Sequence, residues 1–221
     1  MWATAQYLNY ARPPSVMDID VTVASAGHQT TQARAVAHVG DREILTVNAA
    51  LGDRSFPESG QWVERPSVPD PDDCPPRESQ RNVSDSILSR LDQRWALQGG
   101  DGSGRCAVWS RMPDLLGVSA PALAVLGDYV PLGLGVTLEN DITSNSLDNT
   151  LRVANLVPTE WVLLDIRVHA VERGFGHGLV HMFAEDGTLL ATASQSCIVR
   201  FWKGEEPGER AAPAGQEGER R

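Results

Sequence analysis

The 221-residue chain repeats itself at an offset of 145 residues. Without a gap, the two copies align Pro13 with Pro158, Asp20 with Asp165 and Val23 with Val168. Alternation is a stronger signal than these few identities, because the apolar positions 17, 19, 21 and 23 correspond to the apolar positions 162, 164, 166 and 168. Successive side chains of a strand point to opposite faces, so matched alternation predicts matched strands. Two copies of one β-rich unit predict a pseudo-twofold arrangement, since a solenoid would need at least three shorter repeats.

The two copies differ in length. Met1 aligns with Ser146, so nothing in this chain corresponds to residues 105–145. That stretch predicts a strand at 106–109 and then a helix that Ser119 caps, with Pro121 in its first turn and apolar residues at 123, 125 and 126. We therefore expect a first unit without its opening strand and helix, through an N-terminal truncation or a mispredicted start, or with that surface covered in another way. An uncovered concave face would favour poor solubility or a homo-oligomer.

Charge and cysteine content narrow the classes of function. The formal charge of −10 argues against nucleic acid or an anionic membrane surface as the main partner. The chain has no run of 18 apolar residues and no basic N-terminal region before an apolar core, so we expect neither a membrane span nor a signal peptide. Its three cysteines, Cys74, Cys106 and Cys197, form no CxxC pair, which favours a reduced, cytoplasmic protein.

Runs of Pro, Gly and Asp divide the chain into four parts. Residues 1–51 form a partial first unit, with strands expected at 4–10, 16–24, 30–38 and 44–50. Residues 52–103 form a Pro-rich linker. Within 83–98 of this linker, the spacing of Ile87, Leu88, Leu91 and Trp95 predicts a short amphipathic helix. Residues 104–203 form the second unit, and 204–221 have the composition of a disordered tail.

A strand and a helix followed by four strands, in two copies, predict an α+β fold of the double hotdog type, with each antiparallel sheet wrapped on one central helix. The second unit resembles the second half of the acyl-CoA thioesterase II family in the blocks Ser146-Leu147-Asp148-Asn149-Thr150, Pro158-Thr159-Glu160-Trp161, Leu163-Leu164-Asp165 and Glu185-Asp186-Gly187-Thr188-Leu189-Leu190-Ala191-Thr192-Ala193-Ser194-Gln195. The first unit resembles that family's first half, minus its beginning, in Trp2-Ala3-Thr4-Ala5-Gln6-Tyr7-Leu8 and Glu43-Ile44-Leu45-Thr46-Val47-Asn48. The resemblance covers residues 1–51 and 104–203.

The resemblance implies hydrolysis of fatty acyl-CoA to free acid and CoA, in lipid metabolism, with no covalent intermediate, cofactor or metal. It also implies three side chains that hold the attacking water, which in this sequence are Asp128, Ser146 and Gln195. A carboxylate such as Asp128 can take the proton of the water, and the neutral Ser146 and Gln195 can orient it. In the first unit Ser146 and Gln195 align with Met1 and Ala50, so only the second unit is expected to be catalytic.

Other interpretations of these residues stay open. Asp128 could cap a helix, Gln195 could make a structural hydrogen bond across the sheet, and Asp148 could replace Ser146 as the polar participant. A non-catalytic protein that binds acyl-CoA or an acyl carrier would have the same fold. A hotdog hydratase or dehydratase would need an Asp-His pair, and neither Asp128 nor Gln195 has a neighbouring His in sequence.

Two further patterns favour structure over function. His177 and His181 could share a face, but no third zinc ligand is placed nearby, so we expect solvent-facing strand histidines. The glycine-rich run at 174–178 lacks the strand before it and the helix after it that a phosphate-binding loop requires. A strand turn or close sheet packing is therefore expected there.

Overall fold

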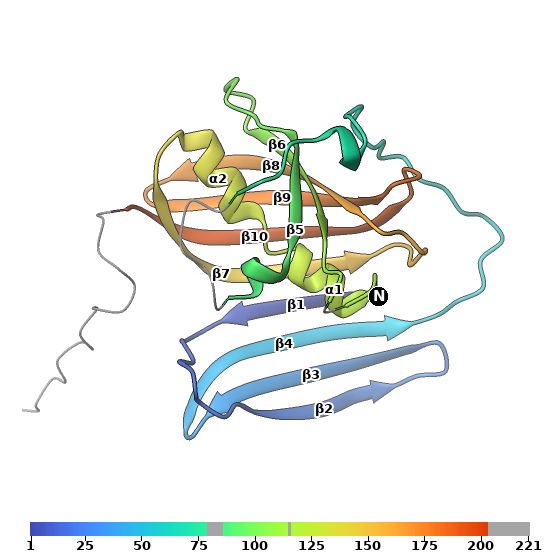
Figure 1. The fold of residues 1–221 in the computed structure, drawn as a ribbon. Coiled ribbons are helices and arrows are strands. Elements are labelled where there is room, and N and C mark those ends of the chain that lie inside the picture. Colours follow the sequence, from blue (N-terminus) through green and yellow to red (C-terminus); the bar gives the residue numbers. More distant parts are fainter. Residues whose placement is uncertain (79–85, 115, 203–221) are drawn as a thin grey trace, which may run out of the picture.

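The computed structural model describes residues 1–78, 86–114 and 116–202, and the predicted tail at 204–221 lies outside them. In this part of the chain, ten strands form one antiparallel sheet in the order β2-β3-β4-β1-β7-β10-β9-β8-β6-β5 (Figure 1). Their bounds are Trp2–Tyr7 (β1), Asp18–Ala26 (β2), Thr30–Val39 (β3), Arg42–Gly52 (β4), Asp92–Leu97 (β5), Arg105–Arg111 (β6), Ile142–Val153 (β7), Val162–Glu172 (β8), Phe175–Ala184 (β9) and Leu189–Phe201 (β10). Two helices, Ala120–Leu126 (α1) and Val130–Leu138 (α2), pack on one face of its second half.

The internal repeat is visible in the strands. A shift of 145 residues moves the bounds of β3 onto those of β9 and places β1, β2 and β4 on β7, β8 and β10 within a few residues. The sheet order is correspondingly symmetric about the antiparallel contact between β1 and β7, where Thr4 lies opposite Thr150 and their hydroxyls hydrogen-bond. The predicted pseudo-twofold pairing of two β-rich units is confirmed, and so are the four strands of the first unit.

The helices fill the concave side of the second half. Leu123, Leu126, Val130 and Leu134 are buried against apolar side chains of β6 to β10, and α2 has its main contacts with β8 and β9. Burying each of these leucines contributes about 1.5–3 kcal/mol. The predicted strand at 106–109 and the helix capped by Ser119 are confirmed as parts of β6 and α1.

The stretch Ala120–Leu138 is long and apolar enough, by length and composition, to cross a membrane. In the fold it is interrupted between Leu126 and Val130, and its apolar side chains pack against the sheet. This is the arrangement of a core helix that covers a hydrophobic sheet face.

The short amphipathic helix predicted within residues 83–98 is wrong for the described residues. Ile87–Arg90 form one 3-10 turn, and Asp92–Leu97 form β5, which pairs with β6; residues 79–85 lie outside the described residues. Leu91 and Trp95 are four positions apart, a spacing that places two side chains on one face in both a helix and a strand. Pairing with β6 selects the strand, so the sheet of the second half begins at β5.

The Pro-rich connection between the two halves covers the convex face of the second sheet. Trp109, Trp161, Leu163 and Phe183 are buried on that face, with Val63, Val68 and Cys74 packed against them. The indole Nε1 of Trp109 donates to the carbonyl of Pro69 at 2.9 Å. Apart from a 3-10 turn at Pro71–Asp73, the stretch from 53 to 78 has no regular element, as expected, but it contributes to the core.

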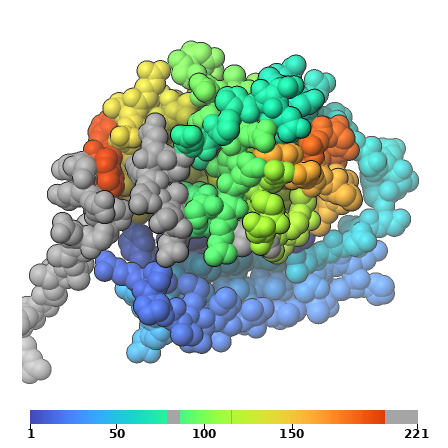
Figure 2. All heavy atoms as spheres, in the orientation of Figure 1, coloured from blue at the N-terminus to red at the C-terminus, as the bar shows by residue number. Residues whose placement is uncertain are grey.

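The corresponding concave face of the first half is open. Directly opposite residues of neighbouring strands project from the same face of the sheet. Val21 therefore lies on the face of the sheet that the helices cover in the second half, as shown by a row of opposite residues that crosses the sheet: Val21, Ala35, Val47, Ala5, Asn149 and Gln195. Ile19, Val21 and Val23 on the edge strand β2 are 61%, 67% and 57% exposed. In Figure 2 the strands of the first half, β1 to β4 (blue), form the lower rim of the molecule, below the second half. Within the described residues, this face has no helix of its own.

Candidate active site

Asp128 lies in the break between α1 and α2. The helix α1 begins at the cap Ser119, whose hydroxyl accepts from the N–H of Ala122, and ends where Gly127 donates to the carbonyl of Leu123 at 2.8 Å. A Cβ on Gly127 would lie 2.9 Å from the Cβ of Ala193 on β10, so glycine lets this end of α1 approach the sheet closely. The approach brings Asp128 next to β10.

The structure brings Asp128, Ser146 and Gln195 together from three elements. Gln195 on β10 donates through Nε2 to Oδ1 of Asp128 and, at 2.8 Å, to the hydroxyl oxygen of Ser146 on β7. A carboxylate only accepts hydrogen bonds, so the contact with Asp128 fixes which end of the Gln195 amide faces it. Gln195 is 2% exposed, and the contact ties the helix break to two adjacent strands. Whether the three side chains are catalytic stays a prediction.

A β-bulge beside Gln195 positions the hydroxyl of Ser146. The register of β10 on β7 shifts between Ser196 and Cys197, so that Cys197 lies opposite Ser146 and not Leu147. Asp148 stabilises this bulge by accepting the N–H of Ser196 at 2.6 Å. The carboxylate of Asp148 is thus engaged by backbone, while Ser146 is the residue that bonds to Gln195.

The surroundings of Asp128 favour its protonated form. Burial raises the pKa of the Asp128 carboxyl above the ordinary aspartate value, and hydrogen bonds from Gln195 and Ser146 lower it only in part. Asp128 as a whole residue is exposed, and solvent reaches its side chain through a cleft, whereas the side that contacts Gln195 and Ser146 is packed against the protein. A carboxylate with a raised pKa is a stronger base than an ordinary aspartate, which suits it to accept a proton from water near neutral pH.

The cleft that contains Asp128 has a volume of about 760 Å³ and lies between α2, the start of β7 and the strand β5. Leu88, Trp95, Leu132 and Val136 give it an apolar part. Its polar residues besides Asp128 include Arg77, Glu78, Glu139 and Asp141. An elongated, partly apolar ligand with polar groups fits such a lining.

Sequence reasoning missed two features of the surroundings of Asp128. Tyr7, from the first half, is half-buried there; burial and the carboxylates of Asp128 and Asp148 raise its pKa. The next residue after Asp128, Tyr129, accepts a hydrogen bond from Gln93 of β5 at 2.7 Å, and burial raises its pKa to about 12. Both depend on pairing between distant strands, for which no local sequence signal exists.

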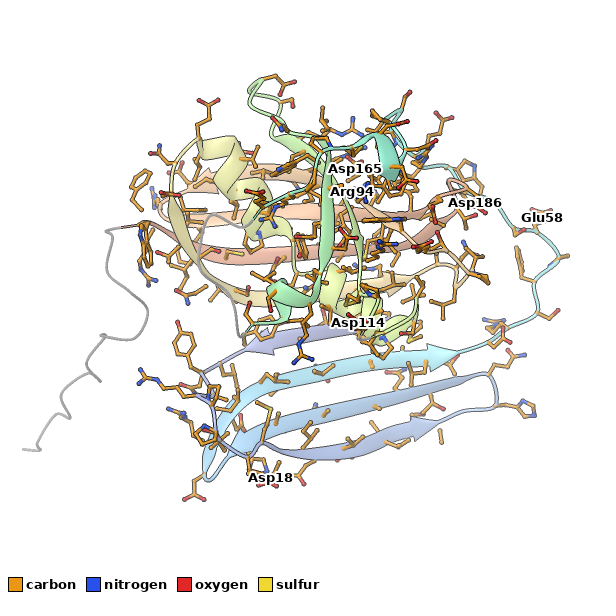
Figure 3. The ribbon with its side chains drawn as sticks, in the orientation of Figure 1. Asp18, Glu58, Arg94, Asp114, Asp165 and Asp186 are labelled. Carbon is orange, nitrogen blue, oxygen red and sulfur yellow. The ribbon has the colours of Figure 1, made fainter. Side chains whose placement is uncertain are left out.

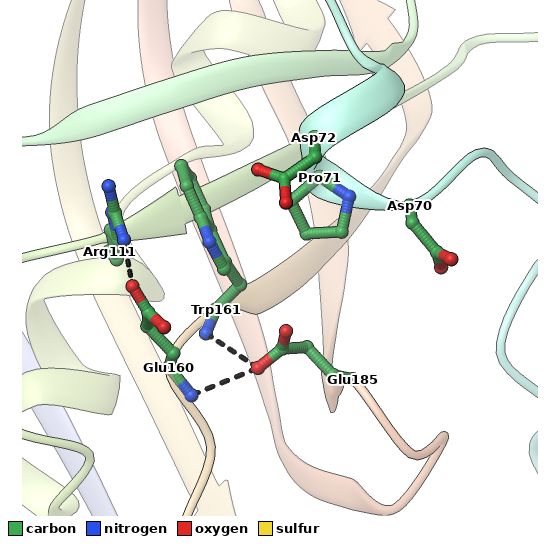
Figure 4. A pocket seen from close by; sticks show the side chains of 7 residues that line it. All are labelled: Asp70, Pro71, Asp72, Arg111, Glu160, Trp161 and Glu185. Carbon is green, nitrogen blue, oxygen red and sulfur yellow. Dashed lines mark hydrogen bonds and ion pairs between the residues drawn. The ribbon is translucent and has the colours of Figure 1, made fainter.

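A second pocket, of about 420 Å³, lies on the other side of the second half and does not include Asp128 (Figure 4). Its carboxylates are largely engaged within the protein. Glu160 pairs with Arg111, and Glu185 accepts the N–H groups of Glu160 and Trp161 at 3.0 and 3.1 Å. These contacts stabilise the turn before β8. Across residues 1–78, 86–114 and 116–202, no group of three or more His, Cys, Asp or Glu side chains could hold a metal ion.

The histidine and glycine patterns have structural explanations. His177 is exposed and lies edge-on to His169, as expected for a solvent-facing histidine. The same expectation is wrong for His181, which is 8% exposed because it lies beside the buried Asp165 in the middle of the sheet. Arg173 and Gly174, with φ of 51° and 77°, form the turn between β8 and β9, and a Cβ on Gly176 would meet Leu134 of α2 at 2.7 Å. The expected turn and close packing are confirmed.

Comparison with known protein families shows which family the chain belongs to. The family described as "Acyl-CoA thioesterase C-terminal domain" matches residues 63–199, more than half of the sequence. The chain belongs to the acyl-CoA thioesterase family. The crystal structure of a candidate thioesterase from Novosphingobium aromaticivorans is 32% identical in sequence to this chain, with a TM-score of 0.82 over 89% of this chain and 78% of that chain.

More distant structures share the fold. The acyl-CoA thioesterase II TesB2 of Mycobacterium marinum is 22% identical in sequence to this chain, with a TM-score of 0.77 over 92% of this chain and 81% of that chain. A hot dog fold protein of unknown function from Alicyclobacillus acidocaldarius is 18% identical, with a TM-score of 0.80 over 90% and 78%. These likenesses confirm the hotdog fold class. No curated protein matches the chain.

Proposed function

We propose that the chain hydrolyses fatty acyl-CoA to free acid and CoA, with Asp128, Ser146 and Gln195 holding the attacking water. The observation that carries this proposal is the hydrogen-bonded contact of the three side chains, of which Asp128 lines the 760 Å³ cleft. Membership of the acyl-CoA thioesterase family supports the substrate class, and the partly apolar lining of the cleft suits an acyl chain.

The proposed reaction is a direct attack of water on the thioester carbonyl. Asp128 takes a proton from the water while the water oxygen bonds to the carbonyl carbon, and Ser146 and Gln195 fix the geometry. Backbone N–H groups at the start of α2, next to Asp128, are the proposed donors to the developing oxyanion, where the helix dipole also favours negative charge. Collapse of the tetrahedral intermediate breaks the carbon–sulfur bond, and protonated Asp128 returns its proton to the thiolate of CoA.

A hydratase or dehydratase is less well supported. That chemistry would use an Asp-His pair, and all five histidines lie in the described part of the chain. None of them hydrogen-bonds to Asp128: His38 bonds to Asp20, His169 lies edge-on to His177, and His181 lies by Asp165. A non-catalytic protein that binds acyl-CoA or an acyl carrier is the remaining alternative, because the same cleft could hold a ligand without cleaving it.

The first test is thiol release from short to long acyl-CoAs, followed colorimetrically, for the parent and for Gln195→Ala. We expect kcat to fall at least about tenfold in the variant, a barrier change of about 1.4 kcal/mol, because the contact that orients Asp128 and the water is removed. Gln61→Ala is a matched control, since Gln61 bonds to Val63 and Gly187 outside the cleft. No thiol release from the folded parent, together with tight acyl-CoA binding in calorimetry, would favour the non-catalytic alternative.

We also propose that the open apolar face of the first half drives self-association. Ile19, Val21 and Val23 are the most exposed apolar side chains of that face. Exposed apolar area of a few hundred Å² is typical of an association surface. Light scattering should show oligomers or aggregates of the parent and a smaller species for the variant with Ile19→Thr, Val21→Thr and Val23→Thr. A monomeric parent would contradict the proposal.

A cytoplasmic location is a further proposal. Cys74, Cys106 and Cys197 are buried free thiols, and burial raises the pKa of Cys106 to about 12 and that of Cys197 to about 11. Free, protonated thiols of this kind are typical of proteins in a reducing compartment. Fractionation of the native host, with detection of the protein in the soluble cytoplasmic extract, tests this location.

A further inference from the structure

Two amide oxygens beside Asp128 are buried without a hydrogen-bond donor. They are Oε1 of Gln195 and Oδ1 of Asn149, and neither has a partner among the described residues. Gln195 cannot turn its amide to relieve this, because its Nε2 is already bound to Asp128 and Ser146. Buried polar atoms in proteins are nearly always hydrogen-bonded, so an oxygen left over next to a reactive carboxylate indicates a ligand or water.

Strand register places the two oxygens side by side. Asn149 on β7 lies directly opposite Gln195 on β10, and opposite Ala5 of β1 on its other side. Directly opposite residues of an antiparallel sheet project from the same face, with Cβ atoms about 4.5–5.5 Å apart. The next pair on that face, Leu151 and Ala193, belongs to the core beneath the helices. Asn149 therefore lies on the same side of the sheet as Asp128, and Ala5 presents only a methyl group beside it.

The chemistry of the site requires a donor at this position. A water molecule has two O–H groups, and one of them can be shared between two adjacent acceptors in a three-centre hydrogen bond. The other O–H then points toward Asp128, and the lone pairs of the water oxygen remain free to attack a carbonyl carbon. Gln195 alone, without a second acceptor oxygen beside its Oε1, would hold the water in a less well-defined orientation.

We propose that Asn149 is a further catalytic residue, which binds the attacking water through Oδ1 jointly with Oε1 of Gln195. The inference rests on the proposed thioester hydrolysis and extends it, since a fourth side chain, from the strand that adjoins the first half, takes part in orienting the nucleophile. No proton is transferred to Asn149: the amide accepts a hydrogen bond, Asp128 takes the proton, and the water oxygen forms the new bond to carbon.

The kinetic test uses two substitutions at Asn149. Asn149→Leu has a similar size without an acceptor, and we expect kcat to fall about tenfold or more with KM changed less than about twofold, because the water and not the substrate loses a contact. Asn149→Asp keeps an oxygen in place but adds a negative charge near Asp128. It should retain more of kcat than Asn149→Leu, and the acid limb of its pH–rate profile should move to higher pH, since a like charge disfavours ionisation of Asp128.

A control and a structural readout complete the test. Asn145→Leu removes an amide from the same strand that bonds instead to Tyr10 and Arg200, and it should change kcat less than about twofold. A high-resolution crystal structure of the parent should show a water within hydrogen-bond distance of both oxygens. An Asn149→Leu variant as active as the parent, or no such water, would overturn the inference. A parent that holds the water but releases no thiol would instead contradict the proposed function while leaving the water site intact.

Discussion

Replacing Asp128 with Asn is expected to lower kcat for thiol release by about a thousandfold, within the range of 10²–10⁴ that general acid–base catalysis contributes. The amide has nearly the shape of the carboxylate and can still accept the hydrogen bond from Gln195, but it cannot take a proton from water. A thousandfold loss corresponds to about 4 kcal/mol in the activation barrier. Asp18→Asn, on the edge strand β2 of the first half (Figure 3), is the matched control, because Asp18 does not line the cleft, and it should retain full activity.

The pH dependence of the parent gives an independent readout of the same group. Burial raises the pKa of Asp128, so kcat/KM should fall on the acid side with an apparent pKa above that of an ordinary aspartate. A carboxyl with a raised native pKa binds protons more tightly in the folded than in the unfolded chain. The parent should therefore lose stability as pH rises from the ordinary aspartate pKa to the raised one, and the loss persists above it.

The Asp128→Asn variant lacks this titration. As the pH rises through this window, the melting temperature of the variant should therefore increase relative to that of the parent. This gain should persist at neutral pH. A variant that is inactive yet at least as stable at neutral pH would support a carboxylate kept for chemistry at the expense of stability. Activity within about tenfold of the parent would contradict a role as general base, since the loss would be below the range of such catalysis.

The fold was predictable from the sequence mainly because alternation is a local property. The alternating apolar residues of the first unit and their counterparts at 162–168 predict strands without knowledge of what they pair with, and β2 and β8 are found there. The cap at Ser119 predicts the start of α1 for the same reason. Asp128, Ser146 and Gln195 came from resemblance, since 67 residues separate the carboxylate from the amide that it contacts.

Features that depend on pairing were not predictable. The stretch at 92–97 suits either a helix or a strand, and only contact with β6 decides for the strand. Asp20 and Asp165 are equivalent in the repeat, yet the side chain of Asp20 is 81% exposed and that of Asp165 is completely buried. The difference arises because β2 is an edge strand with no partner beyond it, whereas β8 lies between β6 and β9. Asn149 became a candidate only when register placed it opposite Gln195.

The positions of Asp128, Ser146 and Gln195 also depend on how the two halves of the sheet join. Ser146 and Asn149 lie on β7, the strand of the second half that pairs directly with β1 of the first half. Tyr7, at the end of β1, reaches the surroundings of Asp128 from that side. The first half thus contributes to the surroundings of Asp128 through Tyr7, even though its own positions equivalent to Ser146 and Gln195 are Met1 and Ala50.

Removing the buried carboxylate of Asp165 is expected to have the largest effect on stability. Asp165, which is labelled in Figure 3, has no exposed surface and holds two guanidinium groups: Arg105 donates to Oδ1 at 2.7 Å, and Arg167 donates to Oδ2 through Nε at 3.1 Å and Nη2 at 2.9 Å. Breaking a buried ion pair by deleting one partner costs about 3–5 kcal/mol, because the remaining charge is left without compensation. The side chains of Arg105 and Arg167 are 34% and 41% exposed, so water partly compensates their charges, and Asp165→Ala should lower the free energy of unfolding by about 3 kcal/mol, the low end of this range.

The reason for this large expected effect is the arrangement of charge around Asp165. Arg105 and Arg167 lie directly opposite each other on β6 and β8, so without Asp165 two like charges face each other across one strand pair, a destabilising contact. His181 adds no compensation, since burial and then the charge of Arg167 lower its pKa. Urea unfolding of Asp165→Ala measures the loss. Glu172→Ala, at the far end of the same strand, removes the partner of Arg173 in an exposed pair and should cost less than about 1 kcal/mol. Equal losses in the two variants would show that the Asp165 group contributes no more than a surface ion pair.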